Sequence, residues 1–138
     1  MSLFADRFFE NLDYGTRFDH VAGNLQAYII IMVLVWTHGS FFEELLFRAF
    51  TITKASTFLG GGRTGDIIAL LVSSVFFGYR HAYYQGIHGA LMTGAGGFAF
   101  GLLYLWFGRQ NILPLIFAHG IFNSLGQTFR FLGIKDPE

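Results

Sequence analysis

The sequence contains no cysteine among its 138 residues. This absence excludes disulfide bonds, thiolate metal sites and a cysteine nucleophile. Charged residues are also scarce: they make up 13% of the chain, whereas a soluble domain usually carries about 25%. The formal net charge is zero, which argues against nucleic acid as a partner. No cleavable signal peptide is predicted either, because residues 1–24 are polar and mixed in charge.

Apolar and small residues are correspondingly abundant. Hydrophobic residues make up 53% of the chain, and phenylalanine and glycine occur 18 times each. This composition is typical of helical membrane proteins, in which apolar side chains face lipid and glycines allow close helix contacts. We therefore predict an all-α, polytopic integral membrane bundle with about four spanning helices, each adequate for a hydrocarbon core of about 30 Å. Their approximate ranges are 25–50, 67–84, 91–107 and 112–132, with a flexible loop over 51–66.

The segments outside these spans are more polar. In residues 1–24, apolar side chains recur at helical spacing, which predicts a short interfacial helix lying on the membrane; a partly disordered terminus is the alternative. The chain thus divides into this N-terminal segment, a membrane-embedded core over 25–132 and a tail over 133–138. Within the core, Gly97 and Gly101 form a GxxxG pair, which predicts a close helix contact and implies no chemistry.

A cluster of charges interrupts the first apolar stretch. Glu43, Glu44 and Arg48 lie within it, although an ionisable residue near a bilayer centre costs roughly 2.5–3.5 kcal/mol on insertion scales. A capping box formed by Ser40 and Glu43 at a helix start would explain those two residues. It would not explain Glu44 or Arg48, so a functional role remains the competing interpretation.

Three of the four predicted spans carry such side chains in pairs that are one helical turn apart. The pairs are Glu44 and Arg48, Phe77 and His81, and His119 and Asn123. Two residues at this spacing point to the same side of a helix. We therefore expect the three helices to direct these side chains toward one shared site, with an ion pair between Glu44 and Arg48.

The residue types at this site permit hydrolysis. A carboxylate can act as general base on a water molecule, and a nearby histidine can orient that water or share its proton. A second histidine and an asparagine can donate hydrogen bonds to a developing oxyanion. The same glutamate with two histidines could instead bind zinc. The spacing does not choose between these two schemes, and the sequence contains no His-Glu-x-x-His motif.

The order and spacing of the motifs resemble a known family. Glu43-Glu44-x-x-x-Arg48, Phe77-x-x-x-His81 and His119-x-x-x-Asn123 look like the three signature motifs of the CAAX protease and bacteriocin-processing (ABI) family. The similarity covers about residues 40–125 and includes Ser73-Ser74-Val75-Phe76 before the second motif and Asn111-Ile112-Leu113-Pro114 before the third.

This resemblance implies an intramembrane endopeptidase similar to the Ras-converting CAAX protease. By analogy, Glu43 and His81 would activate the catalytic water, and His119 and Asn123 would line the oxyanion side. The supporting positions would be Glu44 and Arg48, which fix and charge-balance the site, and Phe77, which packs beneath His81. The family is better described as glutamate-dependent than as metal-dependent, so no cofactor is expected. If zinc were bound, its ligands would be Glu43, His81 and His119.

Two further functions remain open at this point. A non-catalytic immunity or peptide-binding membrane protein of the same family could use the same cavity, and a proton or cation transporter could use Glu43, Glu44 and His81 as a pathway. The expected partners are a membrane-associated peptide or protein and the lipid bilayer of a prokaryotic inner membrane. Family members usually have more helices before the first motif, so an oligomer or partner subunit that closes the site is a further expected partner. Arg80 is interpreted as a side chain that extends to lipid headgroups, and His38 as an interface residue outside the site.

Overall fold

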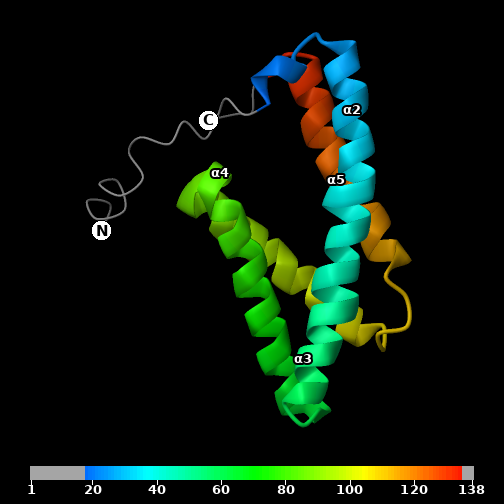
Figure 1. The fold of residues 1–138 in the computed structure, drawn as a ribbon, viewed down its shortest axis with the longest axis vertical. Helices are drawn as coiled ribbons and strands as arrows, with labels where there is room; N and C mark the ends of the chain where they lie inside the picture. The colour runs from blue at the N-terminus through cyan, green and yellow to red at the C-terminus, as the bar shows by residue number, and fades with distance from the viewer. Residues whose placement is uncertain (1–17, 135–138) are drawn as a thin grey trace, which may run out of the picture.

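The computed structural model describes residues 18–134. Every regular element within this range is a helix, which confirms the predicted all-α class. The chain forms one long helical rod, a second long helix that folds back on itself, and a final helix that returns along the rod (Figure 1). A short helix η1 (Asp19–Val21) precedes the rod.

The rod runs without a break from Leu25 to Phe58. It consists of α2 (Leu25–Trp36), two π-helical segments η2 (Thr37–Phe42) and η3 (Leu45–Ile52), and α3 (Thr53–Phe58). Asn24 caps its start, because the side-chain oxygen accepts a hydrogen bond from the Ala27 N–H at 3.1 Å. The wide turns of η2 and η3 flank residues 43 and 44, and such π-type turns occur frequently at functional sites.

The helix passes straight through Ser40, so the capping-box interpretation of Ser40 and Glu43 is wrong. Ser40 is completely buried, and its hydroxyl donates to the Val35 carbonyl at 2.8 Å. Because that carbonyl lies five residues back, the hydroxyl satisfies a backbone group inside the wide turn. The two glutamates therefore need an explanation other than a helix start.

Three glycines with positive φ, Gly60, Gly61 and Gly62, reverse the chain after the rod. The next helix, α4 (Gly62–Trp106), is interrupted at Gly86, whose φ of 66° and ψ of −173° are not helical. This residue divides α4 into a first arm over 62–85 and a second arm over 87–106. The arms touch at Gly78, where an added Cβ would lie 2.5 Å from the Ala90 carbonyl oxygen. Glycine is therefore needed here for the backbones to meet.

The last helix, α5 (Leu113–Phe131), has Pro114 in its first turn, where the missing N–H has no cost. It packs along α2 and η2, whereas α4 packs along η3 and α3 (Figure 1). The approach of α5 is close at Gly120, because an added Cβ would lie 2.6 Å from the Trp36 ring. Glu43 and Glu44 stand between η2 and η3, at the point where the rod changes its packing partner from α5 to α4.

The predicted loop over 51–66 is wrong, because helix occupies all of it except the short turn at Leu59–Gly61. Asp66, one of the polar residues that suggested a loop, has partners on both sides. Ser56 is buried and donates to Asp66, which also forms an ion pair with Arg109. The interfacial helix predicted for the N-terminal segment lies, for residues 1–17, outside the described residues.

Apolar side chains cover much of the outside of the helices, and three charged side chains, Glu43, Glu44 and Arg48, are buried between them. Leu25–Phe58 and Gly62–Trp106 are both long and apolar enough to cross a membrane. The outward face of the first arm of α4 consists of apolar residues that are 41–72% exposed: Ile67, Ile68, Leu71, Val72, Val75 and Phe76. In contrast, Glu44 and Arg48 are 0% and 1% exposed. This arrangement suits a lipid environment; the number of crossings stays a prediction.

Candidate active site

Glu44 is the centre of a buried polar network that joins two helices. Its Oε1 lies 2.8 Å from Nδ1 of His119 on α5, and its Oε2 lies 3.1 Å from Nε of Arg48 one turn along the rod. The ion pair expected between Glu44 and Arg48 is therefore confirmed. Each carboxylate oxygen of Glu44 therefore has one of these neighbours, and the side chain connects the rod to α5.

Arg48 extends the network to the second arm of α4. Its Nη2 donates to the Gly97 carbonyl at 3.3 Å, and its guanidinium carbon lies 4.6 Å from the centre of the Phe77 ring. The absence of a side chain at Gly97 makes room for this contact, since an added Cβ would lie 2.9 Å from Phe77 and 3.5 Å from Arg48. The close contact predicted from the GxxxG pair is confirmed here, where it positions Arg48.

Glu43 is oriented differently from Glu44 and faces a cavity. Its Oε1 lies 3.5 Å from Nη2 of Arg80 on α4, and its Oε2 lies 4.0 Å from Nε2 of His119. The interpretation of Arg80 as a headgroup-directed side chain is wrong, because the guanidinium points inward to Glu43. Its position next to His81 was the one feature of the sequence that could have indicated a place at the site.

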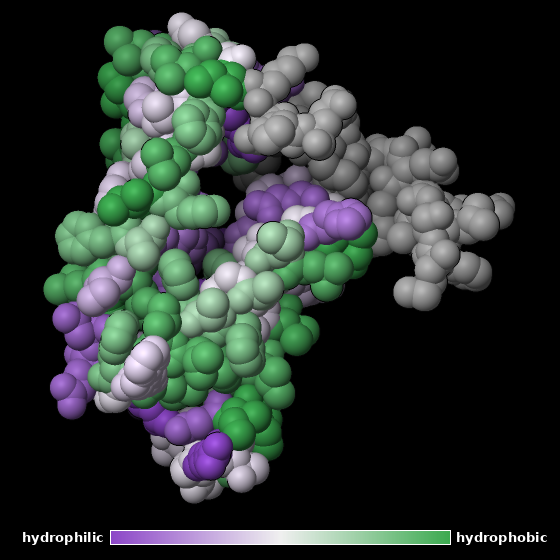
Figure 2. Space-filling view, turned by 180° about the vertical axis from the view of Figure 1, so that it is seen from behind, coloured by the Kyte–Doolittle hydropathy of each residue, from purple (hydrophilic) through white to green (hydrophobic). Residues whose placement is uncertain are grey.

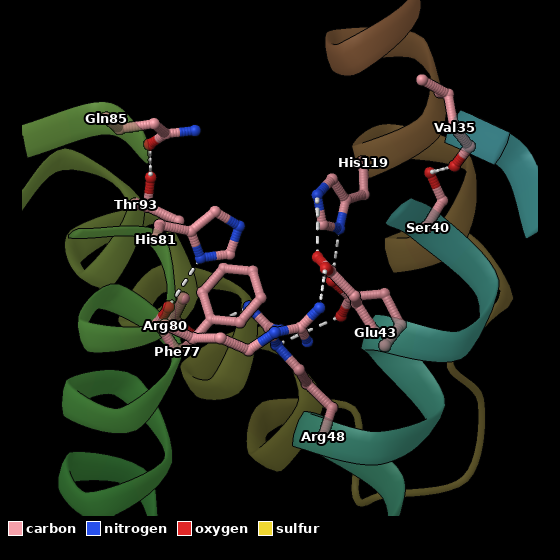
Figure 3. Close-up of polar contacts among 12 residues, drawn as sticks. Val35, Ser40, Glu43, Arg48, Phe77, Arg80, His81, Gln85, Thr93 and His119 are labelled. Atoms are coloured by element: carbon pink, nitrogen blue, oxygen red, sulfur yellow. Dashed lines mark hydrogen bonds and ion pairs between the residues drawn. The ribbon is translucent and has the colours of Figure 1, made fainter. Parts of the chain in front are cut away.

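His81 is held by its own helix. Its Nδ1 lies 2.7 Å from the Phe77 carbonyl oxygen, which can only accept, so Nδ1 carries the proton and donates it. The neutral ring then has its lone pair on Nε2. Phe77 packs against this ring, as expected, with the centroids 4.7 Å apart and the ring planes tilted by 58°. Figure 3 shows His81 on one side of the site and Glu43 and His119 on the other.

The four residues expected to act in catalysis line one cavity of about 830 Å³: Glu43, His81, His119 and Asn123. Asn123 lies one turn beyond His119, as the spacing predicted, and its Nδ2 would be 3.6 Å from a Cβ added at Gly39. His38 also lines the cavity, so its placement outside the site is wrong. The hollow and the polar surface within it are visible between apolar outer surfaces (Figure 2).

The zinc-ligand set considered from the sequence consists of Glu43, His81 and His119. Among residues 18–134, no three histidine, aspartate or glutamate side chains are grouped so that they could hold a metal ion. The arrangement therefore does not form the ligand triad that zinc would need.

Comparison with known proteins is decisive at the level of the family. A family model described as type II CAAX prenyl endopeptidase Rce1-like matches residues 25–125. The chain belongs to this family. Membership confirms the resemblance recognised from the three motifs, and with the apolar exterior it identifies an integral membrane protein from a family of peptidases. No curated protein and no solved structure matches the chain significantly.

Proposed function

We propose that this protein is an intramembrane endopeptidase that hydrolyses a peptide bond of a membrane-associated peptide or protein. The observation that carries the proposal is the single cavity onto which Glu43, His81, His119 and Asn123 all open. Membership of the CAAX prenyl endopeptidase family supports the reaction type. The apolar outer surface supports a substrate that reaches the site from the lipid phase. The prokaryotic cell membrane is part of the proposal and rests on the sequence alone.

Glu43 is the proposed general base. It is 7% exposed and its side chain opens on the cavity, so a water molecule in the cavity can reach the carboxylate. The carboxylate accepts a proton from the water while the hydroxide attacks the peptide carbonyl carbon. When the C–N bond breaks, the same proton passes to the leaving amine, and Glu43 returns to its ionised form.

His81 is the proposed partner of Glu43 in orienting the water. Because Nδ1 donates to the Phe77 carbonyl, Nε2 is the nitrogen that can accept a hydrogen bond from the water. Phe77 supports the ring from below, so its contribution is to the direction in which Nε2 points. Glu43 and His119 both lie close enough to His81 to interact with it electrostatically.

His119 and Asn123 are the proposed oxyanion donors. Glu44 holds Nδ1 of His119 and so fixes the direction of the ring. In the imidazolium form of the ring, Nε2–H would donate to the negative oxygen of the tetrahedral intermediate. The Asn123 amide lines the same cavity and supplies a second donor. Arg48 neutralises Glu44 and so leaves the charge of Glu43 available for chemistry.

The test compares peptides released by the wild-type protein and by Glu43→Gln in the same lipid bilayers, against membrane-anchored peptides. We expect cleavage to fall by about 10²-fold or more, since the amide keeps the size of the side chain but cannot accept the proton. Asp19→Asn is the matched control, because Asp19 is exposed and outside the cavity. A chelator should leave wild-type cleavage unchanged.

Other outcomes would replace the proposal. Equal cleavage by the wild type and Glu43→Gln would exclude Glu43 as the base. Binding of the peptides without cleavage by either protein would favour the immunity or peptide-binding alternative. A pH-dependent proton flux in the same liposomes would favour transport.

A further inference from the structure

The cavity continues along α5 beyond the residues proposed for catalysis. Gly126 and Gln127 also line it, and both lie further along α5 than His119 and Asn123. One turn of helix separates His119 from Asn123, and one more separates Asn123 from Gln127, so the three side chains lie along one side of α5. The polar surface of the cavity is therefore longer than the chemistry at a single peptide bond requires.

Two contacts between α2 and α5 hold this part of the cavity in shape. At one end the Trp36 ring meets Gly120, where an added Cβ would lie 2.6 Å from the ring. At the other end the Tyr28 and Thr128 hydroxyl groups are 2.8 Å apart. Ile31 of α2 lies between these two contacts and lines the cavity. The walls of this part are therefore fixed by packing between the two helices.

Gln127 presents a hydrogen-bonding group that the described part of the chain does not use. Its Oε1 is buried and has no hydrogen-bond partner among residues 18–134. A buried polar atom without a partner is uncommon and costs free energy. The terminal amide of a glutamine turns easily about its last torsion angle, so Oε1 can reach a donor placed in the cavity. A ligand with an N–H group would therefore satisfy it.

Gly126 leaves space next to this amide. No atom lies within 4 Å of a Cβ added at Gly126, and the residue lines the cavity. Gly120 on the same helix has the opposite surroundings, because the Trp36 ring fills the space beside it. Gly120 thus packs two helices together, whereas Gly126 leaves room for a ligand to approach the backbone of α5.

We propose that Gly126 and Gln127 form a second substrate subsite, which binds an extended segment of the polypeptide through its backbone. Oε1 of Gln127 accepts a hydrogen bond from a backbone N–H of the substrate, and the space at Gly126 admits the chain. His119 and Gln127 are about 12 Å apart along α5, since a helix rises about 1.5 Å per residue. An extended chain advances about 3.3 Å per residue, so the bound N–H belongs to a residue about three to four positions from the scissile bond. The inference rests on the proposed function only for this position relative to the scissile bond.

The first measurement uses binding alone, with Glu43→Gln as the background so that the peptides stay intact. Each of a series of membrane-anchored peptides carries one ester oxygen in place of a backbone N–H, and its Kd is measured in bilayers. At one position the ester should weaken binding by about 3–10-fold, because one hydrogen bond to a neutral group is lost. With Gln127→Leu added, the same ester should have no effect, because the acceptor is already gone. Esters that weaken binding through other contacts should do so equally in both proteins.

Three further substitutions complete the test. Gln110→Leu makes the same change at an exposed glutamine outside the cavity, and it should keep the ester effect. Gly126→Leu should fill the subsite and weaken binding of the whole series. Gly96→Leu introduces the same side chain at a glycine with equally open surroundings outside the cavity, and it should bind the peptides as the background protein does.

The second measurement uses the protein with Glu43 intact and locates the scissile bond from the masses of the released fragments. The ester position that depends on Gln127 should lie about three to four residues from that bond. A dependent position next to the scissile bond would contradict the proposal. The proposal is also wrong if no ester position depends on Gln127, if no peptide binds, or if Gly126→Leu and Gly96→Leu bind alike. If the ester effect is present and the wild type cleaves no peptide, the proposed function fails and the subsite stands.

Discussion

Nδ1 of His119 lies 2.8 Å from Oε1 of Glu44, although 75 positions separate the two residues in the chain. This contact connects α5 to the rod at the point where the rod changes its packing partner. It also separates the roles of two neighbouring glutamates. Glu44 contacts His119 and Arg48, whereas Glu43 faces the cavity, where its neighbours are Arg80 and His119.

The first prediction concerns the stability of this network. Glu44→Gln should destabilise the folded protein by about 3–5 kcal/mol, because it leaves the buried Arg48 cation without its counter-charge. Glu43→Gln should cost clearly less, because its partner Arg80 remains partly exposed to solvent. Unfolding of both variants in the same detergent checks this difference. Equal destabilisation would show that the two glutamates are not distinct in their structural roles.

The second prediction concerns His81. His81→Gln should reduce kcat by about 10²–10⁴-fold while KM changes little, since the ring is expected to act on the water and not on substrate binding. His88→Gln is the matched control on the second arm of α4, where the histidine is exposed and lies outside the cavity. Steady-state kinetics on one membrane-anchored peptide distinguish the two variants. A large rise in KM with unchanged kcat would assign His81 to substrate binding instead.

The third prediction concerns Asn123. Asn123→Ala should lower kcat by about 10²–10³-fold, which is the usual effect of removing one oxyanion donor. Asn111→Ala provides the comparison, because that asparagine accepts a hydrogen bond from the Leu113 N–H at the start of the same helix and lies outside the cavity. Its removal should affect stability slightly and kcat hardly at all. Similar kcat values for both variants would exclude Asn123 as an oxyanion donor.

The fourth prediction uses two neighbouring glycines. Gly97→Ala should destabilise the protein by about 1–3 kcal/mol, because its Cβ would meet the Phe77 ring at 2.9 Å and Arg48 at 3.5 Å. Gly96→Ala should be neutral or stabilising, since no atom lies within 4 Å of its added Cβ and alanine favours helix. Thermal unfolding of both variants in one detergent measures the contrast. Equal behaviour would mean that the close packing at Gly97 is not required.

Much of the fold followed from the pattern of residues. The helices expected over 67–84, 91–107 and 112–132 occur as the two arms of α4 and as α5, with ends that differ by a few residues. The loop prediction over 51–66 was wrong, because the three consecutive glycines and charged residues such as Asp66 suggest a connector, whereas Ser56 and Asp66 are hydrogen-bonded to each other within the helices. Their contacts with each other and with Arg109 come from packing between helices, which no local pattern reveals.

The candidate site was predictable to a similar extent. Spacing of one turn predicted that Glu44 and Arg48 pair, and motif order indicated that His81, His119 and Asn123 open on one space. The contact of Arg80 with Glu43 was not predicted, since an arginine near the end of an apolar stretch is ordinarily directed to headgroups. This contact joins residues that are 37 positions apart, on the rod and on α4. The rotation of these two helices relative to each other cannot be predicted from the sequence pattern.

The sequence by itself determined the all-helical class, the family and the set of candidate site residues, because these depend on composition, helical spacing and motif order. The tertiary structure decided which carboxylate is bound by its neighbours and which one faces the cavity. Adjacent side chains on a helix point about 100° apart. The wide turns of η2 and η3 and the positions of α4 and α5 therefore determine that Glu44 meets Arg48 and His119, and that Glu43 meets Arg80.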